Sequence, residues 1–187
     1  MKRRTRTITV FGSSRPCESE NEYAVARELG TELAKNGFSV CTGGYGGVME
    51  AVSRGASDAG GRAIGVTTRF FKAYPNKWLD KEIRVKTWRD RLFELIDRGD
   101  GYVVCAGGTG TLVELAVVWE MMNKGVMVKK PVIDLGDFWK PVIDRVREAE
   151  SAPGSPWIER KGSLIEFAGS PSTAADMLTA YFKLPPR

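Results

Sequence analysis

Histidine is absent from the 187 residues of the chain. This absence excludes Ser-His and Cys-His nucleophile pairs, and it excludes every metal site that uses imidazole ligands. Acid–base chemistry must therefore come from Asp, Glu, Lys, Tyr or Cys. Cysteine is scarce as well. Cys17, Cys41 and Cys105 are odd in number and widely spaced, so we expect reduced thiols and neither a disulfide framework nor a cysteine-rich metal site.

Long hydrophobic runs are missing too. No apolar stretch approaches the roughly 18 residues that a membrane-spanning helix needs, and the basic residues 1–6 lead into a strand instead of the apolar core of an export signal. We therefore expect a cytoplasmic protein with no membrane partner. Hydrophobic residues make up 42% of the chain and charged residues 27%, which suits a single globular domain over residues 1–187.

The net charge of +5 raises the question of nucleic acid binding. Basic residues are scattered along the chain, apart from the N-terminal cluster and Lys124, Lys129 and Lys130. This distribution favours a solvated basic surface that attracts anionic metabolites over a nucleic-acid footprint. We expect a small-molecule partner and no nucleic acid.

Three apolar, β-branched runs end in turns of small residues. The runs cover residues 7–11, 38–41 and 102–105, and the turns that follow cover residues 12–15, 42–47 and 106–111. Glycines let a backbone approach an anion closely, and a helical pattern opens after the second and third turns, where free N–H groups attract phosphate. The candidate phosphate-binding residues are Ser13, Ser14, Arg15, Gly43, Gly44, Gly46, Gly47, Gly107, Gly108, Thr109, Gly110 and Thr111.

Strand and helix patterns alternate along the whole chain. Further strands are expected near residues 63–67, 83–85, 131–135 and 164–167, with a helix over 138–148 and a last helix that ends near residue 183. This alternation predicts one three-layer α/β/α Rossmann-like domain with a doubly wound parallel sheet. Residues 68–82 look like an irregular surface segment, whose aromatic residues (70, 71, 74 and 78) suit a base pocket, a dimer contact or simple burial under a loop.

Three familiar phosphate folds do not fit these turns. None of the turns has the Lys-Ser/Thr ending of a P-loop, and the first lacks the glycine spacing of a dinucleotide-binding motif. The second strand ends in Thr42, where such a motif has an acidic residue that hydrogen-bonds the ribose hydroxyls. Thr111 stands six residues beyond Cys105, where a cysteine-nucleophile phosphatase needs an arginine.

Several segments together resemble the LONELY GUY (LOG) family, long mislabelled "lysine decarboxylase". Residues 107–114 (Gly-Gly-Thr-Gly-Thr-Leu-Val-Glu) look like its PGGxGTxxE signature, residues 43–56 like its GGGxxGLMxAVxxGA stretch, residues 10–14 like its first strand and turn, and residues 130–132 like the start of a later strand. These matches span roughly residues 7–146, in the order that one Rossmann-like domain demands.

The resemblance implies hydrolysis of the N-glycosidic bond of nucleoside 5′-monophosphates, such as AMP or cytokinin riboside monophosphates, to a free base and ribose 5-phosphate. It implies Glu114 and Arg91 as the catalytic residues, no metal or organic cofactor, and a homodimer. A second interpretation of the same fold is a non-catalytic carrier of a phosphorylated ligand, similar to molybdenum-cofactor carrier proteins. A regulatory nucleotide sensor is a third.

Local patterns offer plainer roles for both catalytic candidates. Thr111 and Glu114 have the T-x-x-E spacing of a helix capping box, and Arg91 has Asp90 and Glu94 as ion-pair partners on its own helix. The chain also departs from the family pattern. Ala106 replaces the proline of the signature, Leu92 replaces a lysine after the arginine, and Val113 replaces a glutamate, which leaves the preferred base open.

Overall fold

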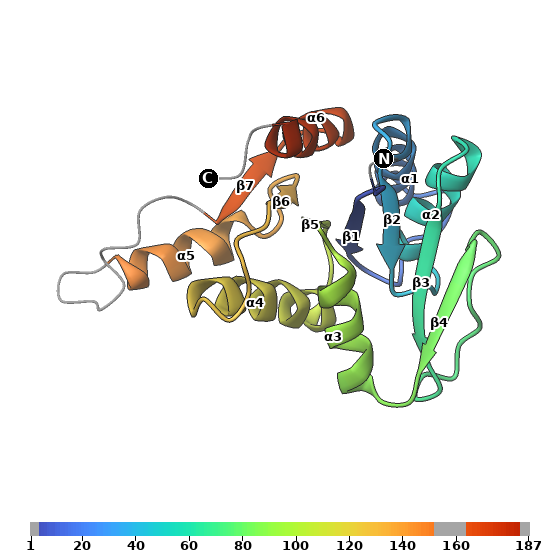
Figure 1. Ribbon diagram of the computed structural model, residues 1–187, viewed down its shortest axis with the longest axis horizontal. Helices are drawn as coiled ribbons and strands as arrows, with labels where there is room; N and C mark the ends of the chain where they lie inside the picture. The colour runs from blue at the N-terminus through green and yellow to red at the C-terminus, as the bar shows by residue number, and fades with distance from the viewer. Residues whose placement is uncertain (1–3, 152–163, 184–187) are drawn as a thin grey trace.

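The computed structural model describes residues 4–151 and 164–183. Within them, seven strands form one sheet in which all neighbouring strands are parallel (Figure 1). The strands are β1 (Thr7–Phe11), β2 (Ser39–Thr42), β3 (Ala63–Thr68), β4 (Lys81–Val85), β5 (Gly101–Val104), β6 (Val132–Leu135) and β7 (Ile165–Ala168). Every residue of β2, β3, β5 and β6 is buried, which explains why these strands read as continuous apolar runs in the sequence.

Six helices of the described residues cover the two faces of the sheet. They are α1 (Asn21–Lys35), α2 (Val48–Asp58), α3 (Trp88–Arg98), α4 (Thr109–Asn123), α5 (Lys140–Glu150) and α6 (Pro171–Lys183). Side chains of α1, α2 and α6 share one apolar cluster with one face, and side chains of α3, α4 and α5 share a second cluster with the other. The predicted three-layer α/β/α architecture is confirmed. Among these helices, none has the length and apolar character needed to cross a membrane.

The strand order locates the place where the connections reverse direction. It runs β4-β3-β2-β1-β5-β6-β7, so the chain builds outward from β1 to β4 and then crosses to β5 on the other side of β1. The connections that leave β1 and β5 therefore diverge. In open α/β sheets, ligands bind in the crevice outside the carboxyl ends of two such strands.

Two helix starts show how local sequence and packing compete. The start of α3 is a capping box, in which the Thr87 hydroxyl accepts from the Asp90 N–H at 3.0 Å and the Asp90 carboxylate accepts from the Thr87 N–H at 3.1 Å. The expected start of α5 at Phe138 is wrong by two residues. Trp139 is buried, and its indole N–H donates to the Cys105 carbonyl at 2.9 Å, so the helix begins only after this anchor.

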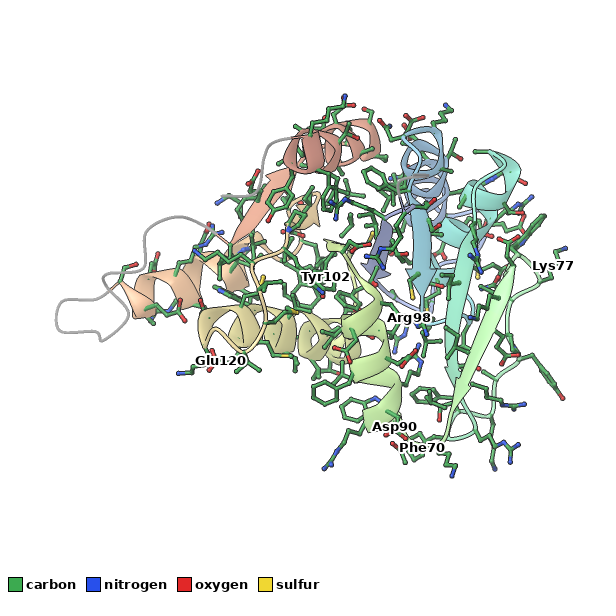
Figure 2. All side chains as sticks on the ribbon, viewed as in Figure 1. Phe70, Lys77, Asp90, Arg98, Tyr102 and Glu120 are labelled. Carbon is green, nitrogen blue, oxygen red and sulfur yellow. The ribbon has the colours of Figure 1, made fainter. Side chains whose placement is uncertain are left out.

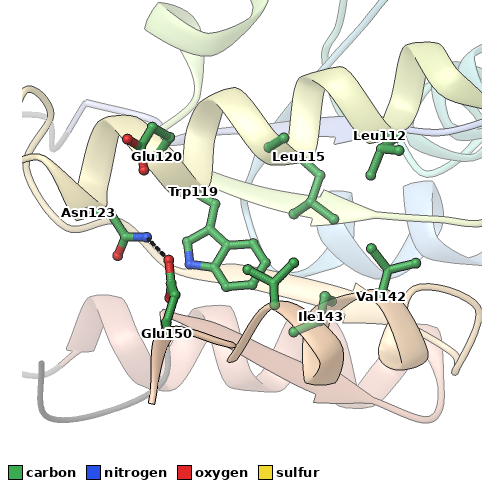
Figure 3. A pocket seen from close by; sticks show the side chains of 10 residues that line it. Leu112, Leu115, Trp119, Glu120, Asn123, Val142, Ile143 and Glu150 are labelled. Carbon is green, nitrogen blue, oxygen red and sulfur yellow. Dashed lines mark hydrogen bonds between the residues drawn. The ribbon is translucent and has the colours of Figure 1, made fainter. Parts of the chain in front are cut away.

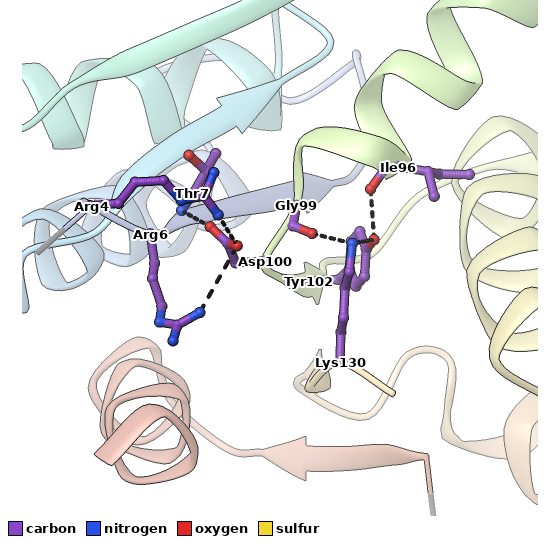
Figure 4. A network of polar contacts seen from close by, with 8 residues as sticks. All are labelled: Arg4, Arg6, Thr7, Ile96, Gly99, Asp100, Tyr102 and Lys130. Atoms are coloured by element: carbon purple, nitrogen blue, oxygen red, sulfur yellow. Dashed lines mark hydrogen bonds and ion pairs between the residues drawn. The ribbon is translucent and has the colours of Figure 1, made fainter. Parts of the chain in front are cut away.

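Several basic side chains are engaged at the amino ends of the strands, opposite the glycine turns (Figure 4). Asp100 accepts from Arg4 at 2.5 Å and from the Thr7 N–H at 2.8 Å. Lys130 Nζ donates to the hydroxyl of Tyr102 at 3.2 Å. These contacts tie the loops before β1, β5 and β6 together, so part of the positive charge of the chain serves the fold itself.

Candidate active site at the carboxyl edge of the sheet

The structure brings the three glycine turns together at the carboxyl edge. The Ser13 N–H donates to the Ala106 carbonyl at 3.0 Å, and the Ser13 carbonyl accepts from the Val48 N–H at 2.8 Å. The turn after β1 is therefore hydrogen-bonded on one side to the turn after β5 and on the other side to the start of α2. All three turns border the crevice that the strand order defines.

Two glycines of the turn after β2 have a steric reason for their identity. Gly47 has a φ of +69°, and a Cβ there would lie 2.4 Å from the Ser13 carbonyl oxygen. A Cβ at Gly43 would lie 1.7 Å from a terminal nitrogen of Arg91. These glycines hold the site together, whereas exposed Gly108 and Gly110 have no atom within 4 Å of an added Cβ.

The N-terminus of α4 is open to solvent. Gly108 is the N-cap and supplies no side chain, and the first backbone bond of the helix is from the Leu112 N–H to the Gly108 carbonyl at 3.0 Å. No acceptor in the described part of the chain binds the N–H groups of Thr109, Gly110 and Thr111. Unpaired N–H groups and the positive end of the helix dipole make this turn suited to an anion.

Glu114 lies in the second turn of α4. It is partly buried, and burial raises the pKa of its carboxyl from 4.5 to about 7, while the charge of Arg91 acts in the opposite direction. The capping-box interpretation of Thr111 and Glu114 is wrong. The helix already begins at Thr109, so Thr111 lies inside the first turn and is not the N-cap residue.

Arg91 reaches across the end of the sheet from α3. It is 8% exposed, its Nε donates to the Val66 carbonyl at 2.9 Å, and a terminal nitrogen donates to the Gly43 carbonyl at 3.0 Å. The guanidinium therefore bridges the ends of β2 and β3, and burial lowers its pKa while the charge of Glu114 raises it. Since Nη1 has no acceptor among the described residues, one edge of the planar fork is uncommitted.

The local ion pairs expected for Arg91 do not form. The carboxylate of Asp90 belongs to the capping box of α3, and Glu94 pairs with Arg98 at 2.5 Å. Both carboxylates therefore have partners other than Arg91. This leaves the guanidinium to the strand ends and to the neighbourhood of Glu114.

The turn after β1 contributes a more exposed part of the edge. The Ser13 hydroxyl accepts from the Arg15 N–H at 3.1 Å, and Ser14 and Arg15 are exposed. A hollow of about 470 Å³ is lined by Ser13, Arg15, Pro16, Glu20, Asn21 and Glu22. Ser13 and Arg15 thus face open space beside the glycine turns.

The buried acid Asp134 was not among the residues predicted from the sequence. This residue of β6 is 0% exposed, and neither carboxylate oxygen has a hydrogen-bond partner within the described residues. Burial raises its pKa from 3.8 to about 6, and the charge of Asp137 adds to the rise. The sequence does mark this position, since an acid interrupts the apolar run 131–135 of a buried parallel strand.

In the described part of the chain, no three His, Cys, Asp or Glu side chains gather as a metal site would require.

Fold and site together define a Rossmann-like α/β protein with a candidate anion site at its topological switch point. The chain belongs to the SLOG cluster4 family, whose model matches residues 5–152. This confirms the resemblance to the LOG family.

Named relatives and a solved structure add to this picture. The chain is 31% identical over 116 residues to the cytokinin riboside 5′-monophosphate phosphoribohydrolase of Mycobacterium tuberculosis, a match that covers 60% of this chain and 62% of that protein. It is 30% identical over 155 residues to the cytokinin riboside 5′-monophosphate phosphoribohydrolase LOG of Oryza sativa subsp. japonica. This match covers 79% of this chain and 63% of that protein. The chain therefore spans slightly less than two thirds of either relative. The structure of the molybdenum cofactor binding protein of Rippkaea orientalis matches with a TM-score of 0.75 and 25% identity, over 96% of this chain and 98% of that one.

Proposed function

We propose that the protein hydrolyses the N-glycosidic bond of nucleoside 5′-monophosphates. The observation that carries this proposal is the position of Glu114. It lies one helical turn beyond the open N–H groups of Thr109, Gly110 and Thr111, within the electrostatic reach of Arg91. A carboxylate so close to a phosphate weakens phosphate binding, so its presence indicates a chemical task.

In the proposed reaction, the 5′-phosphate binds the N–H groups at the start of α4, and the ribose lies against Glu114. As the bond from C1′ to the base nitrogen breaks, its electron pair leaves with the base and positive charge builds on the sugar. The Glu114 carboxylate stabilises that charge and accepts a proton from the water that attacks C1′. The base takes a proton from solvent. The uncommitted edge of Arg91 offsets the charge repulsion between Glu114 and the phosphate.

The pH dependence of the reaction follows from the environment of Glu114. The reaction needs the ionised form, and burial raises the pKa of the carboxyl to about 7. We therefore expect kcat/KM for AMP to rise roughly tenfold per pH unit below about 7 and to level off above it. A rate profile from pH 5 to 9 measures this. A profile that is flat from pH 5 upward would show that no group with this pKa controls the reaction.

The base preference depends on departures from the family pattern. Leu92 is 6% exposed and packs into the core between α3, α4 and the sheet, so the position next to Arg91 supplies no second cation. Ala106 and Val113 replace residues of the signature without removing Glu114. We propose AMP-like nucleotides as the substrate class, with cytokinin riboside monophosphates as the narrower candidates.

The competing function is that of a carrier. It is favoured by the likeness to the Rippkaea orientalis molybdenum cofactor binding protein over nearly the whole length of both chains. In a carrier, the glycine turns hold the phosphate of a pterin and no bond is cleaved. The presence of Glu114 beside the anion site favours the enzyme, because a carrier gains nothing from an acid there.

One assay separates the two functions. Purified protein is incubated with AMP, other nucleoside monophosphates and isopentenyladenosine monophosphate, and the free base is followed by chromatography. Release of base and ribose 5-phosphate from at least one of them supports the proposal. Cleavage of none, together with tight pterin binding, would establish the carrier.

We also propose a homodimer formed through α4 and α5. An apolar groove of about 160 Å³ lies between these helices. Figure 3 shows Leu115 and Trp119 of α4 on one side of it and Val142 and Ile143 of α5 on the other. At its rim, Asn123 donates to Glu150 at 3.4 Å. The apolar residues Leu112, Val113, Val117, Trp119 and Met121 of α4 are only partly buried in the single chain, which leaves apolar surface for a partner.

A substitution at Trp119 tests this interface. Trp119→Glu places a charge in the groove, and we expect it to weaken self-association by about 30-fold or more, because buried aromatic residues dominate such interfaces. Sedimentation velocity over a concentration series measures the effect. A wild-type protein that sediments as a monomer at all concentrations would contradict the proposal.

A further inference from the structure

The loop between β3 and β4 carries aromatic rings beside Arg91. Figure 2 shows Phe70 at the same end of the sheet as Asp90 in the first turn of α3. The rings of Phe70 and Phe71 lie 5.5 Å apart, edge to face, and the ring of Phe71 lies 5.9 Å from Tyr45 at 90°. Phe70 is 70% exposed and Phe71 37%. Two neighbouring phenyl rings therefore face solvent at the edge where the candidate site lies.

The rings of Tyr45 and Phe71 both lie beside the guanidinium of Arg91. The Cζ atom of Arg91 lies 5.5 Å from the ring centre of Tyr45 and 5.5 Å from that of Phe71. A cation over an aromatic face is attracted to it, most strongly where water is excluded. Arg91 thus links the two rings to the neighbourhood of Glu114.

Hydrogen bonds fix the loop relative to the glycine turn after β2. The Tyr45 hydroxyl donates to the Thr68 carbonyl and accepts from the Thr68 N–H, both at 2.9 Å. Asn76 donates from its backbone to the Gly44 carbonyl at 2.9 Å and from its side chain to the Tyr45 carbonyl at 3.1 Å. A ligand bound at the turns therefore meets rings in a fixed position, which reduces the entropy lost on binding.

We infer that Phe71, backed by Tyr45 and Arg91 and flanked by Phe70, is the surface on which the base of the nucleotide stacks. This inference rests on the proposed function, because it takes the phosphate to lie at the start of α4. Every base has a π face that stacks on an aromatic side chain, and the larger purine ring gains more contact than a pyrimidine. The stacking surface should therefore favour a purine base over a pyrimidine base.

The test compares ligands with and without a base. Isothermal titration calorimetry gives the affinities of AMP, CMP and ribose 5-phosphate for the otherwise wild-type protein and for Phe71→Ala, Phe71→Leu and Tyr74→Ala, with Glu114→Gln present in every protein so that AMP is not cleaved during the titration. We expect both Phe71 variants to weaken AMP binding by roughly 10-fold and to leave ribose 5-phosphate within about twofold of the wild type. Tyr74 is the matched control because it lies in the same loop and is 95% exposed, and its variant should bind AMP as the wild type does.

The outcomes separate this inference from the proposed function. Equal affinities of the wild type for AMP and ribose 5-phosphate, or Phe71 variants that keep the full preference for AMP, would overturn the stacking surface even if AMP is cleaved. A preference for AMP that depends on Phe71 would support the surface even if no base is released. If Phe71→Ala does not fold, Phe71→Leu decides, since it keeps an apolar side chain without the ring.

Discussion

Replacing Glu114 with Gln is expected to slow AMP hydrolysis at least ~100-fold while the protein stays folded. The amide keeps the size of the side chain but removes the charge that stabilises the sugar cation and accepts the proton of water. Phosphate binding should not weaken, because a negative charge near the anion site is lost. Single-turnover rates for AMP, with ribose 5-phosphate affinity measured beside them, test both parts.

The same helix offers a matched control for this substitution. Glu120 is an exposed residue of α4 and pairs with Lys124 at 3.5 Å. Glu120→Gln removes the same charge from the same helix away from the candidate site. Because Glu120 lines the groove between α4 and α5, sedimentation velocity first checks that the variant associates as the wild type does, and its rate should then stay within about twofold of the wild type. A Glu114→Gln protein that is as active as Glu120→Gln would remove Glu114 from the mechanism.

The second large effect concerns stability and is expected at Asp134. The folded state raises the pKa of this carboxyl from 3.8 to about 6, so folding favours the protonated form. The ionised carboxylate therefore destabilises the folded protein. This destabilisation is absent well below pH 3.8, grows between the two pKa values and is complete above about pH 6. A shift of this size corresponds to about 3 kcal/mol. Asp134→Asn should therefore raise the free energy of unfolding by about 2 to 3 kcal/mol at pH 8.

Urea unfolding at pH 8 and pH 4.5 tests the sign as well as the size. At pH 4.5 most of the gain should vanish, because wild-type Asp134 is then protonated in the folded protein. Asp176→Asn, at an exposed position of α6, is the control and should change stability by less than about 0.5 kcal/mol at either pH. If Asp134→Asn destabilises the protein at pH 8, the carboxylate has stabilising partners in solution.

The sheet and its turns were predictable because their signals are local. A buried parallel strand is a short apolar run, and each run here ends in a glycine turn. The order of such runs along the chain then fixes a doubly wound architecture. A helix after the third glycine turn was predictable in the same way, although it begins at Thr109, inside the predicted turn 106–111.

Side-chain roles that depend on several strands were not predictable from local patterns. Helix spacing pairs Arg91 with Asp90 or Glu94, yet its guanidinium bonds to carbonyls of β3 and of the turn after β2, which are 25 and 48 residues away. The T-x-x-E spacing of Thr111 and Glu114 fits a capping box, but the glycine turn starts the helix two residues before Thr111. Tertiary packing decides the first case, and the position of the glycine turn decides the second.

The central claim is that the N–H groups at the start of α4 hold the phosphate and thereby place the sugar against Glu114. A crystal structure of the protein with ribose 5-phosphate tests it most directly. We predict that the phosphate accepts from the N–H groups of Thr109, Gly110 and Thr111, with the C1′ side of the sugar facing the Glu114 carboxylate. A phosphate bound anywhere else on the protein, or a Glu114 side chain turned away from the sugar, would contradict the account.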